Sequence, residues 1–365
     1  MHRVERSGGR MPIQTIRTVA IDQRLTDPEW RFAQGPLAGI RGFAIVIADE
    51  RGVEGHGYIR AMPPWTEPLA VVKATFDYLS ADLIGQDETA IGTIMDGLDR
   101  RLHGALPVKA GIECALLDLR ARALGVPLHD LYGGKRQERF ANTRIIPLKS
   151  PQRMAEVAAE LAEAGFRHLK VKVSGEPELD IARVRDVRAA VGQDIALMID
   201  ANESYSPKLA VRTINAMARY GLDLVEQPTS ARDFKSLIAV ASALDIPVEA
   251  DESAQDLQSI LRIVEAGHVA SINLRILNHG GPSRTAQAIA VCRAANVDFR
   301  FGAVFGSSIV HAHTLHLAAS LPPPRFPHEF SEMALLDNDL YSGLHLEAGT
   351  VAVPAGVGTG LAFNG

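Results

Sequence analysis

The sequence predicts an α/β protein in which an N-terminal α+β domain precedes a closed barrel of parallel strands. Over residues 12–138, strand patterns come first and helix patterns follow, which is typical of an α+β domain. From about residue 140, strand and helix patterns alternate strictly. Eight strand candidates in about 190 residues favour a closed barrel over an open, doubly wound sheet.

Composition narrows the classes of partner. The 365 residues are 47% hydrophobic and 22% charged, which suits a globular protein of two domains. The net charge of −5 gives no basic surface for nucleic acid or an anionic membrane. No apolar run reaches the ~18 residues of a membrane span. The two cysteines read as reduced thiols of a cytoplasmic protein.

The N-terminal part divides into a tail and a domain. Residues 1–11 are basic, lack the apolar segment of a signal peptide, and are predicted to be a disordered tail. Residues 12–138 then form the α+β domain. Its predicted strands are 13–22, 40–50 and 52–61, and its predicted helices are 69–85, 93–104 and 108–125.

Two polar loops of this domain carry aromatic residues. Trp30 lies in the irregular stretch 27–39, and Trp65 lies in the second loop, 61–67. Both loops could close over a ligand pocket and give it a partly apolar wall. In the alternative interpretation, the aromatic rings anchor the loops to the domain beneath.

The barrel is predicted over residues 139–331. Its strand candidates are 141–148, 168–173, 195–200, 222–226, 246–251, 270–276, 297–304 and 326–331. Helix-length segments between them begin near serine or proline and end near glycine or asparagine. Residues 332–365 contain a short hairpin pattern and are predicted to return to the first domain.

Three acidic residues close successive barrel strands. Asp200, Glu226 and Asp251 stand 26 and 25 residues apart, which is one β/α unit each time. Carboxylates at adjacent strand ends converge, and Mg²⁺ prefers such oxygen ligands. Three unrelated surface acids would not explain the equal spacing. Asn202 is expected to point the same way as Asp200 and to orient a ligand or water, and Glu252 is expected to form an ion pair behind the metal.

Two lysines precede this trio by one unit. Lys170 and Lys172 alternate with valines in one strand, so both side chains are expected to point into the barrel mouth. Two ammonium groups close together disfavour each other's charge, so one lysine pKa should fall and make that amine a base. Alone, the pattern would equally fit two solvated lysines at a strand end.

These motifs together resemble the enolase superfamily in its mandelate racemase and muconate-lactonizing branches. The similarity runs from residue 12 to the C-terminus, and it includes the Gly280-Gly281-Pro282 turn and the segment 119–135. The resemblance implies an α+β capping domain over a modified TIM barrel, (β/α)7β. It also implies Mg²⁺ on the three carboxylates, Lys172 as the base that removes the proton α to a substrate carboxylate, and Lys170 beside that carboxylate.

The sequence departs from the family at the opposite face of the substrate. The sixth strand carries Arg275 where the lactonizing branch has a lysine, and the seventh strand ends without a base. Arginine is a poor base, so Arg275 is expected to bind substrate oxygen or pair with Glu252. A depressed pKa that lets Arg275 exchange a proton is the rarer possibility.

His328 and Glu329, at the eighth strand, are the candidates for a proton donor near the mouth. Either could protonate a leaving hydroxyl, and structural hydrogen bonding is the equal alternative. The predicted function is therefore a Mg²⁺-dependent dehydratase acting on a small hydroxy or amino carboxylic acid. The alternatives are a racemase, epimerase or cycloisomerase of the same superfamily, or a non-catalytic binding barrel. A homo-oligomer is also expected.

Overall fold

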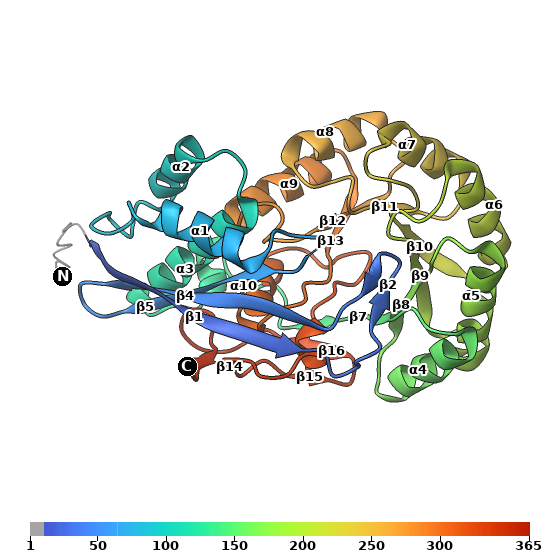
Figure 1. Ribbon diagram of the computed structural model, residues 1–365, viewed down its shortest axis with the longest axis horizontal. Helices are drawn as coiled ribbons and strands as arrows, with labels where there is room; N and C mark the ends of the chain where they lie inside the picture. The colour runs from blue at the N-terminus through green and yellow to red at the C-terminus, as the bar shows by residue number, and fades with distance from the viewer. Residues whose placement is uncertain (1–10, 64) are drawn as a thin grey trace.

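The structure is a computed structural model that describes residues 11–63 and 65–365. Figure 1 shows two parts, a sheet with three helices at the N-terminal end and a ring of strands and helices beyond it. The predicted tail, residues 1–11, lies outside the described residues except for Met11. No helix in the described ranges is long and apolar enough to span a bilayer.

The capping part is an antiparallel sheet covered on one face by helices (Figure 1). Its elements are β1 (Ile13–Arg24), β4 (Gly39–Asp49), β5 (Glu54–Ala61), α1 (Leu69–Ser80), α2 (Ile91–Arg101) and α3 (Leu106–Leu124). The predicted strands and helices of residues 13–125 match these elements. Ile45 and Ile47 of β4 pack with Leu116 of α3 in one core cluster. Gly57 lets α3 approach closely, because a Cβ there would collide with the carbonyl of Gly111.

Seven parallel strands form the barrel sheet in sequence order. They are β7 (Thr143–Ile146), β8 (His168–Lys172), β9 (Ala196–Asp200), β10 (Leu222–Glu226), β11 (Val248–Ala250), β12 (Ser271–Leu274) and β13 (Asp298–Phe301). The helices between and after them are α4 (Pro151–Glu163), α5 (Pro177–Val191), α6 (Pro207–Met217), α7 (Phe234–Ala243), α8 (Leu257–Ala266), α9 (Pro282–Ala294) and α10 (Ser308–Ala319). Figure 1 shows α4 to α9 around the outside of the strands.

The eighth position of the barrel is filled by an irregular segment, residues 327–330. Thr143 N donates to His328 O at 2.8 Å, and Glu329 N donates to Phe301 O at 2.8 Å. The segment therefore lies between β13 and β7 and closes the ring. The capped, modified TIM barrel that the sequence predicts is confirmed, with its last strand reduced to these few bonds.

The C-terminal residues run back along the capping part. The short strands here are β6 (Arg139–Ala141), β14 (Tyr341–Ser342), β15 (Leu346–Glu347), β16 (Thr350–Ala352) and β17 (Ala362–Phe363). The hairpin of β15 and β16 adds to β6. Gly358 O accepts from Leu128 N, and Thr359 N donates to Asp118 of α3, both at 2.8 Å.

The aromatic loops pack inward. The first loop contains a small hairpin, β2 (Arg31–Phe32) with β3 (Gly35–Pro36). Trp30 is only 2% exposed and contacts the rings of Phe32 and Phe305 edge-on. Of the two interpretations of this loop, the anchoring one holds for Trp30, which packs on the barrel segment that follows β13 and does not line the cavity. Trp65 packs on Phe32 and does line the pocket.

Candidate active site

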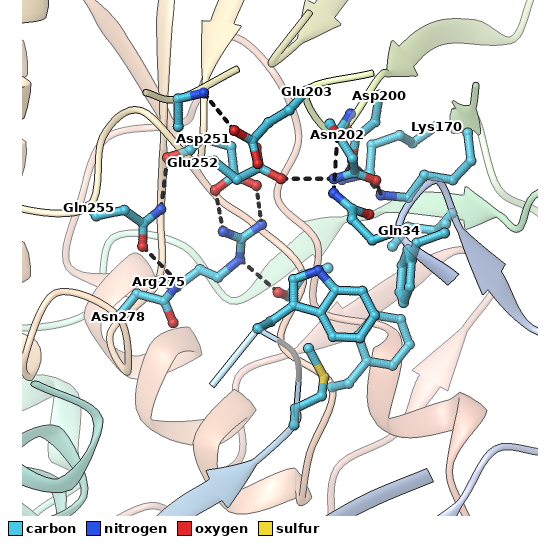
Figure 2. A pocket seen from close by; sticks show the side chains of 18 of the residues that line it. Gln34, Lys170, Asp200, Asn202, Glu203, Asp251, Glu252, Gln255, Arg275 and Asn278 are labelled. Carbon is cyan, nitrogen blue, oxygen red and sulfur yellow. Dashed lines mark hydrogen bonds and ion pairs between the residues drawn. The ribbon is translucent and has the colours of Figure 1, made fainter. Parts of the chain in front are cut away.

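A cavity of about 360 Å³ lies where the C-terminal ends of the barrel strands meet the capping loops. Figure 2 shows acidic and basic side chains of the barrel on one side and aromatic and sulfur-containing side chains in front of them. The barrel supplies Lys170, Lys172, Asp200, Asp251 and Arg275, and the cap supplies Phe32, Gln34, Arg60, Met62 and Trp65. This is the position at which (β/α) barrels place their sites.

The three predicted carboxylates stand at neighbouring strand ends. Asp200 and Glu226 are the last residues of β9 and β10 and are register partners, and Asp251 directly follows β11. All three are almost completely buried. Lys170 Nζ lies 3.5 Å from Asp200 and 3.0 Å from Glu226, so these two carboxylates converge on one amine. Asp251 is instead turned toward Arg275.

Each of these three carboxylates is paired with a cationic side chain. In residues 11–63 and 65–365, no group of three His, Cys, Asp or Glu side chains is arranged to hold a metal ion. Even so, the donor set suits a hard divalent cation, because it consists of buried carboxylate oxygens. Burial and the neighbouring charge of Asp200 raise the pKa of Glu226 well above its usual value, and a cation shared by both would relieve that repulsion. The residues therefore fit the predicted Mg²⁺.

Lys172 lies at the edge of the cavity. Its Nζ donates to Asp200 at 2.5 Å and to Asn202 Oδ1 at 2.8 Å, and it sits 4.8 Å from the centre of the Phe32 ring. Lys170 lies deeper and contacts Glu329 at 2.6 Å. Burial alone would lower the pKa of Lys170, but Glu226, Glu329 and Asp200 raise it above its usual value. The pKa fall predicted for one of the two lysines does not occur at Lys170, because carboxylates outnumber the cationic groups around it.

Arg275 directly follows β12 and forks onto Asp251. Its two terminal nitrogens donate to both carboxylate oxygens (Figure 2), and Nε donates to Ala303 O at 2.8 Å. The expected pairing with Glu252 is wrong. Burial would lower the pKa of Arg275, but Asp251, Glu226 and Glu252 raise it. A depressed pKa at Arg275 is therefore excluded for this arrangement.

Asn202 and Glu252 meet at the cavity wall. Asn202 has a φ of +39°, so the chain turns after β9 and does not continue as a strand. Its side chain nevertheless faces Lys172, and its Nδ2 donates to Glu252 at 3.0 Å. Glu252 forms no ion pair within the described ranges, which corrects the expectation of one. Burial and Asp251 raise the pKa of Glu252 to about 8.

Glu329 and His328 do not line the cavity. Burial would raise the pKa of Glu329, but Arg300 and Lys170 lower it to about 2. A carboxylate held ionised in this way is no proton donor. His328 packs among Phe140, Phe301 and Phe330, and burial and Arg300 lower its pKa to about 3. The structure supports the alternative interpretation, structural hydrogen bonding, since Phe301 N donates to His328 and Ala303 N donates to Glu329. A proton donor at the mouth is not found at either residue.

The sequence analysis missed two arginines. Arg300, in the middle of β13, is fully buried and contacts Glu226 at 2.7 Å, Glu249 at 2.8 Å and Glu329 at 3.2 Å. With Lys170 it forms a charged layer beneath the cavity. The available signal was an arginine between two phenylalanines in a barrel strand. Arg60, at the end of β5, reaches the cavity from the cap, and no spacing in the sequence indicated it.

The geometry defines a capped α/β-barrel enzyme with an acidic centre, and comparison with known proteins gives the family. The mandelate racemase/muconate lactonizing enzyme N-terminal domain profile matches residues 18–133, and the enolase C-terminal domain-like profile matches residues 153–365. The chain belongs to the enolase superfamily, in the mandelate racemase/muconate lactonizing enzyme family.

Individual relatives point to isomerases. The hydrophobic dipeptide epimerase of Enterococcus faecalis is 32% identical over 85% of this chain and 88% of that protein. A chloromuconate cycloisomerase of Pseudomonas putida is 29% identical over 95% of this chain and 96% of that protein. The structure of the E. faecalis dipeptide epimerase with Mg and the dipeptide L-Leu-L-Tyr superposes with a TM-score of 0.91 at 30% identity, covering 96% of this chain and all of that one.

These relatives favour the isomerase alternative over the dehydratase that the sequence predicts as the main function. The epimerase and the cycloisomerase support the alternative prediction of an isomerase, and neither is a dehydratase. The two residues predicted to protonate a leaving hydroxyl, Glu329 and His328, do not lie at the cavity. The chain is an enzyme of the superfamily.

Proposed function

We propose that this protein is a divalent-metal-dependent isomerase that moves the proton on the carbon α to a substrate carboxylate, with Lys172 as the group that carries the proton. One observation supports the proposal most. Lys172 combines an amine at the cavity surface with contacts to Asp200 and Asn202 that fix where the amine lies. A base must be held within hydrogen-bond reach of the proton it removes, and these contacts hold the amine in one place at the cavity.

The metal would be Mg²⁺, held by Asp200, Glu226 and Asp251. When bound, it supplies positive charge that stabilises the negative charge developing on the substrate carboxylate. The chain's own residues do the rest. Lys170 and Arg300 keep the buried carboxylates paired and in place. Phe32, Met62 and Trp65 cover the cavity from the cap and reduce the access of water.

The two faces of the substrate would meet different side chains, a lysine on one and an arginine on the other. β8 and β12 are four positions apart in a ring of eight, so Lys172 and Arg275 face each other across the barrel. Arginine is a poor base, so proton transfer on one face only is the reaction that we favour. This suits a cycloisomerase-type reaction. Epimerisation, which needs a second proton carrier, is the second candidate, because Arg275 stands where that carrier would be.

An N-acylated glycine separates the two reactions. Its α carbon carries two hydrogens, one on each face, and Mg²⁺ with D₂O supplies the exchange. A carrier on one face replaces one hydrogen, so the recovered acid gains one mass unit. Carriers on both faces replace both hydrogens. We expect one deuterium, measured by mass spectrometry. Two deuteriums would establish epimerase-type chemistry at Arg275, and no exchange with N-acylglycines and dipeptides would refute the proposed function.

A further inference from the structure

Asp180 is a completely buried carboxylate in the first turn of α5, and it does not line the cavity. Its two oxygens accept from Ser174 N and Gly175 N, both at 2.9 Å, and Arg183 pairs with it at 2.6 Å. Ser174 and Gly175 lie in the loop that follows β8, two and three residues after Lys172. Asp180 therefore fixes the chain directly behind the amine that faces the cavity.

Tyr205 brings the neighbouring loop to the same carboxylate. This tyrosine lies in the loop after β9, three residues beyond Asn202, and its hydroxyl donates to Asp180 at 2.7 Å. The side chain is buried. Burial and the charge of Asp180 raise the pKa of Tyr205, so the hydroxyl keeps its proton and remains a donor. One carboxylate thus holds the two loops that follow β8 and β9.

The same two chain segments carry the two ends of an active-site contact. Lys172 ends β8, and its amine donates to the side chain of Asn202 at 2.8 Å. Val173 N still donates to Asp200 O at 3.1 Å, and beyond these residues both chains continue as loops. Asn202 has left the strand, with a φ of +39°. The distance between the amine and Asn202 therefore depends on how the loops are joined behind the cavity.

The two loops also touch through their backbones. Gly175 has a φ of +85°, and a Cβ at this position would lie 2.6 Å from Ser204 O, in the loop after β9. Any other residue would therefore push the loops apart, in addition to its strain at this φ. This close approach is next to Tyr205 in the chain, so the backbone contact and the shared carboxylate act at the same place.

We propose that Asp180 and Tyr205 are positioning residues that hold the loops after β8 and β9 together and so keep the Lys172 amine against Asn202. The inference rests on the proposed function for the role of the amine. It goes further because it assigns control of the reaction to residues behind the cavity. Neither Asp180 nor Tyr205 lines the cavity, so their effect must pass through Lys172.

The first test removes one hydroxyl. In Tyr205→Phe, the rate of α-deuterium exchange at saturating N-acylglycine should fall about 10- to 100-fold, because small displacements of a reacting group cost that much. The KM for the acid and the dissociation constant for Mg²⁺ should stay within about threefold, since strand pairing holds Asp200 and Glu226. Rates are expressed per folded molecule, with the folded fraction from urea unfolding, so a loss of stability alone does not lower them. An unchanged rate, or a parallel loss of Mg²⁺ affinity, would overturn the proposal.

Tyr220→Phe is the matched control. Tyr220 lies in the 3-10 helix η2 (Ala218–Tyr220), which precedes β10 at the opposite end of the barrel. The substitution removes the same hydroxyl far from the loops that follow β8 and β9. Exchange in Tyr220→Phe should therefore continue at the parent rate, and a fall equal to that in Tyr205→Phe would count against the proposal.

Gly175→Ala covers the case in which Tyr205→Phe does not fold. It keeps both Asp180 and Tyr205 but separates the same two loops, because the added Cβ collides with Ser204 O. Exchange should fall about 10- to 100-fold here as well, with Mg²⁺ affinity within about threefold of the parent. Exchange at the parent rate in Gly175→Ala would overturn the proposal.

Crystal structures of the variants give a readout that is independent of turnover. In Tyr205→Phe the Lys172 amine should lie beyond hydrogen-bond distance of Asn202 Oδ1, instead of at 2.8 Å. If that contact is kept, the proposal fails even where exchange slows. A displaced amine in the variant, with no exchange in the parent, would refute the proposed function alone. Exchange in the parent that Tyr205→Phe leaves unchanged would refute this inference alone.

Discussion

Two cationic side chains face the cavity from β8, and two face it from the opposite wall. The lysine side consists of Lys170 and Lys172, and the arginine side consists of Arg275 and Arg60. The formal charges are equal, but an ammonium group can release its proton near neutral pH far more readily than a guanidinium can. Side chains of equal formal charge can therefore have different roles in the site, depending on how readily they release a proton. We expect proton transfer on the lysine side and recognition of the substrate on the arginine side.

The largest effect is expected from removing the amine that faces the cavity. In Lys172→Met, α-deuterium exchange should fall about 10²- to 10⁴-fold, the usual contribution of a positioned base. Mass spectrometry of an N-acylglycine incubated with Mg²⁺ in D₂O measures the rate. Lys149→Met is the control, because Lys149 is also a largely covered lysine in a carboxylate pair but contacts Asp27 outside the cavity. Exchange at the parent rate in Lys172→Met would remove the distinction between the two sides.

The charged layer beneath the cavity supports both sides, and its loss should be the next largest effect. Arg300→Met leaves Glu226, Glu249 and Glu329 without their shared guanidinium, and breaking buried pairs of this kind costs about 3–5 kcal/mol. Urea unfolding measures the change. Arg325→Met is the control. It removes an exposed arginine that pairs with Asp298 of β13, the strand that also carries Arg300, and should change the free energy of unfolding by about 0.5 kcal/mol or less. A similar small change in Arg300→Met would mean that the layer is not structural.

Much of the lysine side could be predicted from the sequence because it repeats. Lys172, Asp200 and Glu226 each end a strand of one β/α unit, and Asp251 directly follows the next strand. Parallel strands bring such positions to one edge. The strands and helices of the cap also follow from their periodicity, since Ile45 and Ile47 alternate as a half-buried strand requires. Regular repetition is a local signal, so spacing was sufficient.

The arginine side and the closing segment could not be predicted in the same way. Arg60 meets Phe305 across 245 residues, and no local pattern encodes such a contact. The pair His328-Glu329 shows a second limit. Spacing along a strand indicates that neighbours face opposite sides, but it does not give the depth of an inward side chain. Glu329 points inward below the cavity, into the layer of Lys170 and Arg300, and His328 points into phenylalanine rings.

Acid should lower the free energy of unfolding through His328, which lies in the closing segment, residues 327–330. The pKa of folded His328 is lowered to about 3 by burial and by Arg300, below its value of about 6.5 in the unfolded chain. Its stabilising contribution is therefore present above pH 6.5 and is lost as the pH falls. Between pH 7 and pH 5 the parent should lose about 2 kcal/mol more than His328→Gln, by the linkage of titration to folding.

Urea unfolding at both pH values measures this difference. Glutamine keeps an oxygen that can accept from Phe301 N, so the local hydrogen bond is preserved in the variant. His103 has an exposed side chain, and His103→Gln serves as the control. If the parent and His328→Gln lose equal stability on acidification, His328 is not the group that makes the closing segment sensitive to acid.

The smallest expected effect tests how the arginine side and the metal share Asp251. Arg275 donates to both oxygens of that carboxylate, so a bound Mg²⁺ would compete with it for Asp251. In Arg275→Met the competing guanidinium is gone, and the affinity for Mg²⁺ should rise about tenfold, or ~1.4 kcal/mol. Calorimetric titration with Mg²⁺ alone measures it without substrate. Lys172→Met removes a positive charge near Asp200 and controls for charge in general.

Three outcomes are distinguishable. A larger gain in Arg275→Met than in Lys172→Met supports direct competition for Asp251. Equal gains would mean that only the summed positive charge opposes the metal, and the two sides would then be equivalent toward Mg²⁺. Weaker binding in Arg275→Met would mean that the arginine holds Asp251 in the orientation the metal needs, because an unpaired carboxylate would then turn away. In that case the arginine side would help to build the metal site, and the division between a reacting side and a recognising side would no longer hold.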